Sequence, residues 1–278
     1  MAGLKMDLSI VLPVYNGASF VASSVATLAE FLSRQRFSWE IVLVDDGSTD
    51  GTASLVPGGS RVTVMRLPAN RGKFAAVKAG MAAATGRCRI FTDADVPYDL
   101  EALPYVESLV STRGFHVVVG DRALTESIYG KRLTRSRAVA SRGFSFLVRM
   151  LVTGGLFDTQ CGLKGFRGDV ADALFPLLTV EGFAGDVELL YVALKYNLEI
   201  RRIPVRLRKS ETSTIRFARH APLMLGNALR LRGKWVRGRY ESAALRTLAA
   251  QAYWHAPVLP RPTPPREASP GSGTIEKA

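Results

Sequence analysis

The chain has 278 residues, 47% of them hydrophobic and 22% charged, a balance that is ordinary for a globular protein with one large core. It carries a formal net charge of +13, which favours an anionic partner. The only two cysteines, Cys88 and Cys161, exclude a disulfide framework and a cysteine-based metal site. Cys88 begins an apolar run and is expected to be a buried thiol, and a reducing, cytoplasmic location fits this cysteine content.

The first half of the chain alternates short apolar, β-branched runs with helical patterns. Because the runs are almost continuously apolar, we expect strands that are covered on both faces. Alternation of strand and helix predicts an α/β fold with a mostly parallel sheet, whose ligands bind beyond the carboxyl ends of the strands. The expected strands are residues 8–15, 39–44, 61–67, 88–92 and 116–120, and the expected helices are residues 18–35, 73–85 and 99–112.

After residue 122 the pattern becomes more basic and more helical. We divide the chain into an α/β domain (residues 1–213), a basic amphipathic helical extension (214–256) and a disordered tail rich in Pro, Ser and Gly (257–278). We expect helices at 136–153, 170–178 and 186–196, and strands at 158–166 and 199–207.

The positive charge is concentrated in two segments. Between Arg122 and Arg149 there are seven basic residues and one acidic residue, and between Arg201 and Arg239 there are twelve basic residues and only Glu211. Such clusters suggest phosphate groups, an anionic membrane surface or nucleic acid as the partner.

The second basic cluster has the pattern of a helix that lies on a membrane. Basic residues fall on one helical stripe, and an apolar stripe comprises Leu225, Leu229, Val236 and Tyr240. The alternative is a helix that packs on its own domain. No stretch reaches the ~18 uninterrupted apolar residues of a spanning helix, and the N-terminal residues show no signal-peptide pattern, so we expect peripheral association.

Polar motifs follow three of the expected strands: PVYNG at 13–17, VDDGSTDG at 44–51 and FTDADVP at 91–97. The carboxyl ends of parallel strands share one edge of the sheet, so we expect these motifs to lie together. Asp45 and Asp46 could accept hydrogen bonds from a base or ribose, or could form an Asx turn.

Asp93 and Asp95 flank Ala94 directly after a strand. Alternate residues of an extended chain point the same way, so the two carboxylates would converge. Such hard oxygen ligands beside a diphosphate are typical of an Mg²⁺ or Mn²⁺ site, although an isolated DxD also recurs by chance.

Taken together in this order, PVYN, DDGSTDG, NRGK followed by AVKAG, and DAD resemble the family 2 glycosyltransferases of the GT-A fold. The segments DTQCGLKGFR (158–167) and GFAGDVELL (182–190) are most similar to the dolichyl-phosphate β-glucosyltransferase branch of the polyprenyl-phosphate sugar synthases. The resemblance covers residues 8–216 and implies a nucleotide-sugar-binding, Rossmann-like sheet flanked by helices. The chain departs from the family at Ser213-Thr214, where Ser-Lys is frequent, and lacks the transmembrane helices of many relatives.

The resemblance also implies roles for single residues. Asp95, Arg122, Arg137 and Asp186 are the candidate catalytic residues, with the two arginines facing the acceptor phosphate and Asp95 the principal metal ligand beside Asp93. Asp186 could instead favour the N-terminal dipole end of its helix. The candidate nucleotide-sugar-binding residues are Pro13, Tyr15, Asn16, Asp45, Asp46, Lys73, Asp93 and Arg208, of which Lys73 and Arg208 would reach the donor phosphates.

The resemblance therefore implies an inverting, metal-dependent hexosyltransferase that uses Mg²⁺ or Mn²⁺. It would move a hexose from a nucleotide sugar (UDP-glucose before GDP-mannose) to a polyprenyl or dolichyl phosphate at the cytoplasmic face of an anionic membrane. A phosphate acceptor is already ionised at neutral pH, so the reaction needs no general base.

Two alternatives remain open. A family 2 enzyme acting on a soluble hydroxyl acceptor, as in polysaccharide or natural-product assembly, would need a base, for which Asp186 is the one candidate. A non-enzymatic nucleic-acid binder would interleave basic residues with aromatic ones. The sequence lacks that pattern, so we expect no nucleic-acid partner.

Overall fold

The computed structural model describes residues 6–127, 158–182, 184–208 and 230–251. Several predictions therefore lie outside the described residues: the helix at 136–153, the arginine at position 137, the loop at 213–214, the residues at 225 and 229, and the tail at 257–278.

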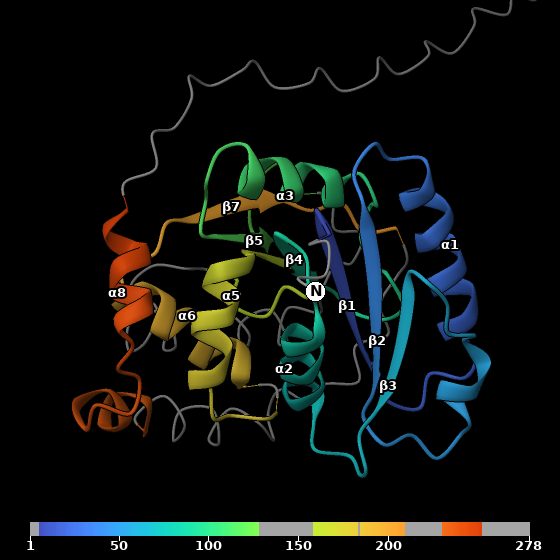
Figure 1. Cartoon of the computed structure of the whole chain (residues 1–278), viewed down its shortest axis with the longest axis horizontal. Coiled ribbons are helices and arrows are strands. Elements are labelled where there is room, and N and C mark those ends of the chain that lie inside the picture. The colour runs from blue at the N-terminus through green and yellow to red at the C-terminus, as the bar shows by residue number, and fades with distance from the viewer. Residues whose placement is uncertain (1–5, 128–157, 183, 209–229, 252–278) are drawn as a thin grey trace, which may run out of the picture.

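The centre of the protein is a seven-stranded mixed sheet of order β3-β2-β1-β4-β6-β5-β7 (Figure 1). All neighbouring strands are parallel except at β6, which runs antiparallel to both β4 and β5. The mostly parallel sheet is thus confirmed. The strands are β1 (Leu8–Val14), β2 (Trp39–Asp45), β3 (Val62–Arg66), β4 (Cys88–Phe91), β5 (Val117–Asp121), β6 (Lys164–Arg167) and β7 (Ile200–Pro204).

Helices cover both faces of the sheet, as the apolar strands predict. Side chains alternate along a strand, so Val11 faces one hydrophobic cluster and its neighbours Ile10 and Leu12 face the other. One cluster includes α2 (Lys73–Ala83), α5 (Gly168–Leu174), α6 (Gly185–Lys195) and α8 (Ala243–Ala250), and the other includes α1 (Val21–Ser33) and α3 (Ala102–Ser111).

The structure differs from the sequence-based elements at three places. Residues 158–163 precede β6 and are not a strand, although their composition suggested one. Helix α5 gives way to a short 3₁₀ helix, Phe175–Leu177, with a proline in its first turn, where the missing N–H costs nothing. A second 3₁₀ helix, Thr52–Leu55, follows the DDGSTDG motif and was not predicted.

The described part of the C-terminal extension packs on the α/β domain. Residues 230–236 are helical, and Leu231, Tyr240 and Leu245 are buried in the same cluster as α6. Val236 is 84% exposed whereas Tyr240 is 1% exposed, so the prediction that these two share one surface stripe is wrong. Among the described residues, no helix combines the length and the apolar character needed to cross a bilayer.

Candidate active site

Hydrogen bonds join the loop that follows β1 to the loop that follows β2. The Asn16 N–H donates to Ser48 Oγ at 2.8 Å, and Asn16 Oδ1 accepts from the Thr49 N–H at 2.9 Å. The Gly17 N–H donates to Thr52 Oγ1 at 2.9 Å. These bonds hold Asn16 in a left-handed conformation with φ of 50°.

Two of the predicted nucleotide-binding residues lie at the end of β1, where the first of these loops begins. Pro13 is buried within β1, and Tyr15, just after the strand, is 48% exposed. The exposed ring of Tyr15 leaves an aromatic face available for a planar ligand.

Asp45 and Asp46 are both buried but have different surroundings. Asp46 accepts the N–H of Arg71 at 2.9 Å and of Gly72 at 2.8 Å, so both of its oxygens hold the NRGK loop. Asp45 Oδ1 accepts from the Ser48 N–H at 2.9 Å. Its Oδ2 accepts no hydrogen bond from the described residues, although Arg66 Nε lies 3.5 Å away. Asp45 is thus better placed than Asp46 to accept a hydrogen bond from a ligand.

The NRGK loop leads directly into α2, whose first residue is Lys73. Its ammonium forms an ion pair with Asp93. Burial lowers the pKa of Lys73, but Asp93 and Asp186 outweigh this effect, and the pKa is raised. Burial likewise raises the pKa of Asp93, and Lys73, Lys164 and Arg122 together hold it below its usual value. Both groups are therefore charged at neutral pH.

Asp93 and Asp95 lie in a turn in which the Val96 N–H donates to the Asp93 carbonyl at 2.9 Å. The expectation that they continue the strand in extended alternation is wrong, because Val96 adopts a φ of 47° and closes the turn. Within the described residues, no group of three or more His, Cys, Asp or Glu side chains could hold a metal.

A backbone pairing brings Arg208 beside this turn. The Arg208 N–H donates to the Pro97 carbonyl at 2.7 Å, and Tyr98 pairs with Leu207 in an antiparallel bridge. Arg208 is exposed, so its long side chain is at the surface next to the DAD turn.

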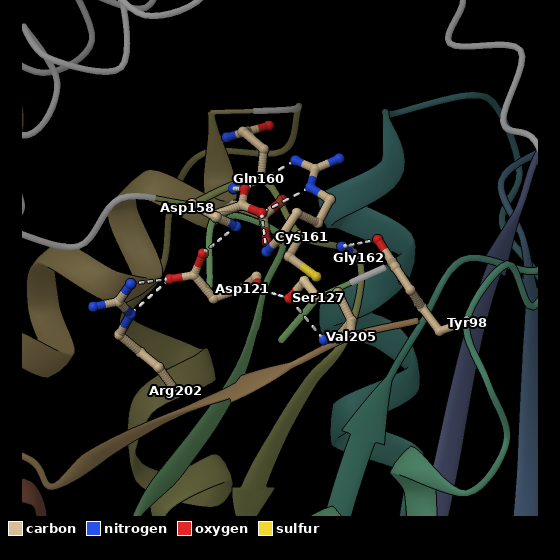
Figure 2. A network of polar contacts seen from close by, with 12 residues as sticks. Tyr98, Asp121, Ser127, Asp158, Gln160, Cys161, Gly162, Arg202 and Val205 are labelled. Carbon is tan, nitrogen blue, oxygen red and sulfur yellow. Dashed lines mark hydrogen bonds and ion pairs between the residues drawn. The ribbon is translucent and has the colours of Figure 1, made fainter. Parts of the chain in front are cut away.

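Arg122 follows β5 and is held by Asp158 of the DTQCG motif. Its Nε and Nη2 donate to the two Asp158 oxygens at 2.7 and 2.9 Å, and its backbone N–H donates at 3.0 Å. Burial lowers the pKa of the Arg122 guanidinium, but its bonds to Asp158 more than compensate, so the pKa is raised. Nearby, Arg202 of β7 pairs with Asp121, as Figure 2 shows.

The DTQCG segment packs directly on the DAD turn. The Gly162 N–H donates to Tyr98 Oη at 3.2 Å (Figure 2). A Cβ at position 162 would overlap the Asp93 carboxylate. Cys161 is fully buried, and burial raises the pKa of its thiol to about 11, so it is not a thiolate nucleophile. The interpretation of Cys88 as a buried thiol is confirmed.

Lys164 connects this segment to α6. It is completely buried, and its ammonium donates to Asp186 Oδ1 and to the Cys161 carbonyl, both at 2.7 Å. The ring of Phe91 lies 5.3 Å from the ammonium. Asp186 thus lies in a buried ion pair at the first turn of α6.

Two of these residues were not predicted to have a role. Asp158 and Lys164 lie within the quoted motif, but their partners Arg122 and Asp186 are distant in sequence. The one available indication is the residue type, because an acidic residue and a lysine within an apolar segment imply that each has a buried partner of opposite charge.

Comparison with known proteins agrees with this arrangement. Residues 9–175 match the model of glycosyl transferase family 2. The chain belongs to this family. It is 31% identical over 246 residues to a dolichyl-phosphate beta-glucosyltransferase of Dictyostelium discoideum, covering 83% of this chain and 75% of that protein. It is 34% identical over 218 residues to the Drosophila melanogaster protein of the same name, covering 73% and 67%. The predictions of a glycosyltransferase and of this branch are confirmed.

Solved structures support the fold. Glucosyl-3-phosphoglycerate synthase from Mycobacterium tuberculosis, in complex with UDP, aligns with a TM-score of 0.61 and 19% identity over 80% of each chain. Mannosyl-3-phosphoglycerate synthase from Rubrobacter xylanophilus aligns with a TM-score of 0.62 and 18% identity, covering 92% of this chain and 79% of that one. At these identities the likeness concerns the fold alone, which confirms the GT-A expectation.

Proposed function

We propose that this enzyme transfers glucose from UDP-glucose to a polyprenyl or dolichyl phosphate with inversion at the anomeric carbon. The names of the relatives support the sugar and the lipid acceptor. The structural observation that carries the proposal is the packing of the DTQCG segment, whose Asp158 holds Arg122, against the Asp93 carboxylate that pairs with Lys73; this contact brings the donor-side and acceptor-side residues into one site.

In the proposed reaction, an acceptor phosphate oxygen forms a bond to the anomeric carbon. The bond from that carbon to the donor's diphosphate breaks, its electron pair leaves on the diphosphate, and UDP and a β-linked lipid-phosphate sugar result. Lys73 and Arg208 stabilise the negative charge that develops on the leaving group. Arg122, oriented by Asp158, binds the acceptor phosphate, with Arg137 as a second contact.

The residues of the DAD turn fit a divalent metal. Asp93 and Asp95 would hold it through carboxylate oxygens, which Mg²⁺ and Mn²⁺ prefer. When bound, the ion neutralises charge on the diphosphate. Glucosyl-3-phosphoglycerate synthase from Mycobacterium tuberculosis, which is similar in fold, has been solved in complex with Mn²⁺ and UDP-glucose, and this supports the same assignment here.

The environment of Asp186 favours the phosphate acceptor over a hydroxyl acceptor. A general base must be free to take a proton, whereas Asp186 is 4% exposed and is paired with the buried Lys164. An acceptor that is already ionised removes the need for that base.

The test is transfer of radiolabelled sugar by the purified full chain. UDP-glucose with a polyprenyl phosphate and Mn²⁺ should give a product extractable into organic solvent, and GDP-mannose should give much less. Label that enters only a water-soluble acceptor would contradict the lipid assignment. Nucleotide binding is measured separately by thermal shift, where a ligand at about 100 times its Kd stabilises by roughly 2.7 kcal/mol.

We also propose that the enzyme binds the cytoplasmic face of an anionic membrane peripherally through its second basic cluster. Arg230, Arg232, Arg237 and Arg239 are exposed on the described part of that cluster. Each basic side chain near an anionic surface contributes about 1 kcal/mol.

A further inference from the structure

Glu188 in α6 is a buried carboxylate with no role in the reaction proposed above. It is completely buried, and its Oε2 accepts the N–H groups of Thr179 and Val180, both at 2.7 Å. Its Oε1 accepts from Thr179 Oγ1 at 2.7 Å and from Tyr240 Oη at 2.6 Å. Burial raises the pKa of Glu188, but these hydrogen bonds outweigh burial and keep it charged.

The loop that Glu188 holds continues to the start of α2. The carbonyl of Glu181 accepts the N–H of Phe74 at 2.8 Å and of Ala75 at 3.1 Å. Both donors belong to the first turn of the helix; the Phe74 N–H is one of the groups that a helix leaves without an intrahelical partner, and the Ala75 N–H is shared between Glu181 and the Gly72 carbonyl, at 2.9 Å. The N-cap residue is Gly72, which has no side chain to satisfy them, and a Cβ there would lie 2.9 Å from the Glu181 oxygen.

The backbone is therefore held by hydrogen bonds both before and after Lys73. Asp46 holds the N–H groups of Arg71 and Gly72 immediately before it, and Glu181 holds the two N–H groups immediately after it. The side chain of Arg71 also pairs with Glu181. Both supports therefore flank the residue whose ammonium pairs with Asp93.

We propose that Glu188 is a positioning residue for the donor site and that Tyr240 makes the C-terminal segment 230–250 part of its support. Glu188 fixes residues 179–181, these fix the first turn of α2, and that turn directs Lys73 to the donor phosphates. This inference rests on the proposed function, because it assumes that Lys73 contacts the donor.

Tyr240 and Tyr196 provide a matched pair of variants. Tyr240→Phe removes one hydroxyl that donates to Glu188. Tyr196→Phe removes a second buried hydroxyl, which donates to the Tyr240 carbonyl at 2.6 Å and accepts from the Ser242 N–H at 2.8 Å. Both changes weaken the attachment of the same segment, but only Tyr240→Phe removes a contact with Glu188.

The first measurement is hydrogen exchange of the full chain, in a peptide that covers residues 71–78. Loss of a hydrogen bond to a charged group changes an equilibrium about 10-fold or more, so Tyr240→Phe should speed exchange in this peptide by about that factor. Tyr196→Phe should leave it near the wild-type rate. Equal protection in all three proteins would overturn the proposal, and this readout requires no activity.

The second measurement is the Kd for UDP-glucose with Mn²⁺, at temperatures where all three proteins are folded. Tyr240→Phe should raise the Kd several-fold and Tyr196→Phe should not. Equal effects of the two variants would indicate a general loss of stability and would sink the inference. If the wild-type chain binds no nucleotide sugar, the proposed function fails instead, and the exchange result still decides whether Glu188 supports α2.

Discussion

Asp45 and Asp46 are adjacent at the end of β2, but their hydrogen-bond partners differ. Asp46 is fully occupied by backbone N–H groups of the NRGK loop, whereas Asp45 keeps one buried oxygen without a hydrogen bond from the described residues. Arg66 Nε forms an ion-pair contact with this oxygen at 3.5 Å but no hydrogen bond, and a buried acceptor without a hydrogen bond costs about 1–3 kcal/mol. Such a cost is tolerated where a ligand supplies the missing donor, which makes Asp45 the stronger candidate for nucleotide contact.

Asp95→Asn tests the metal assignment at the same scale. It preserves size and removes charge, so the melting temperature should change little. Turnover should fall about 100-fold or more, because the lost interaction stabilises charge in the transition state. The measurement is kcat at several Mn²⁺ concentrations, and full activity at low Mn²⁺ would show that Asp95 is not a ligand.

Gly162→Ala tests the packing of the DTQCG motif on the DAD turn. The added methyl group would overlap the Asp93 carboxylate, so Asp93 must move and its pairing with Lys73 must weaken. Overpacking typically costs about 1–3 kcal/mol, and we expect a larger proportional loss in kcat/KM than in stability.

The matched control is Gly59→Ala, where a methyl group meets nothing within 4 Å. It should leave both the melting temperature and kcat/KM near the wild-type values. If Gly162→Ala also leaves the melting temperature and kcat/KM unchanged, the close approach of Gly162 to Asp93 is not needed for activity.

At the scale of elements, α8 is attached to the sheet through a histidine. His116 is 1% exposed; its Nδ1 accepts the Glu199 N–H at 3.0 Å, and its Nε2 lies 3.1 Å from the Leu248 carbonyl. The first contact requires an unprotonated Nδ1, so the ring is neutral with its proton on Nε2. Burial and Arg167 lower the pKa of His116, against weaker opposing effects of Glu199 and Asp169.

This geometry predicts a loss of stability in acid. Because the folded pKa lies below the ordinary value of 6.5, the unfolded chain binds the proton first as the pH falls. The contribution of His116 to the free energy of unfolding should be present above pH 6.5 and should fall as the pH drops from there to the folded pKa. Melting temperatures at pH 7.5 and 5.5 should therefore differ more for the wild type than for His116→Gln. An unchanged difference would contradict the attachment.

The elements near the site could be predicted to different extents. Strands β1, β2 and β4 are continuous apolar runs, and their parallel pairing places the motifs after them at one edge. Residues 158–163 also read as a strand, yet their polar groups bind Arg122 and Tyr98 instead of a ladder. The insertion of β6 between β4 and β5 was not predicted, because local composition carries no information about strand order.

At the scale of the whole molecule, the uneven charge predicts salt-sensitive binding to anionic vesicles. Truncation of the chain after residue 213 is a poor test of this binding. It would remove Leu231, Tyr240 and Leu245, which belong to the hydrophobic core. Charge reversal at the exposed Arg237 and Arg239 should instead weaken vesicle binding at low salt by about 10-fold or more, since each contact contributes about 1 kcal/mol.

Reversal of Arg34 and Arg36 is the matched control. These arginines are exposed just after α1, on the other side of the molecule from the segment 230–250 (Figure 1), and their reversal changes the net charge by the same amount. It should weaken binding much less in a vesicle sedimentation assay. Equal loss in both variants would mean that only the net charge matters, and binding that persists at high salt would indicate inserted apolar groups.

The position of β6 also has a consequence for how the chain folds. Strands β3, β2, β1 and β4 all lie within residues 8–91, so the chain that forms this half of the sheet is synthesised before β6. One edge of β4 is then left unpaired, because its partner there is β6, and Phe91 of β4 pairs with Lys164. An open edge of this kind invites pairing with another molecule until β6 arrives. During synthesis, residues 8–91 would therefore be the segment most in need of protection from aggregation.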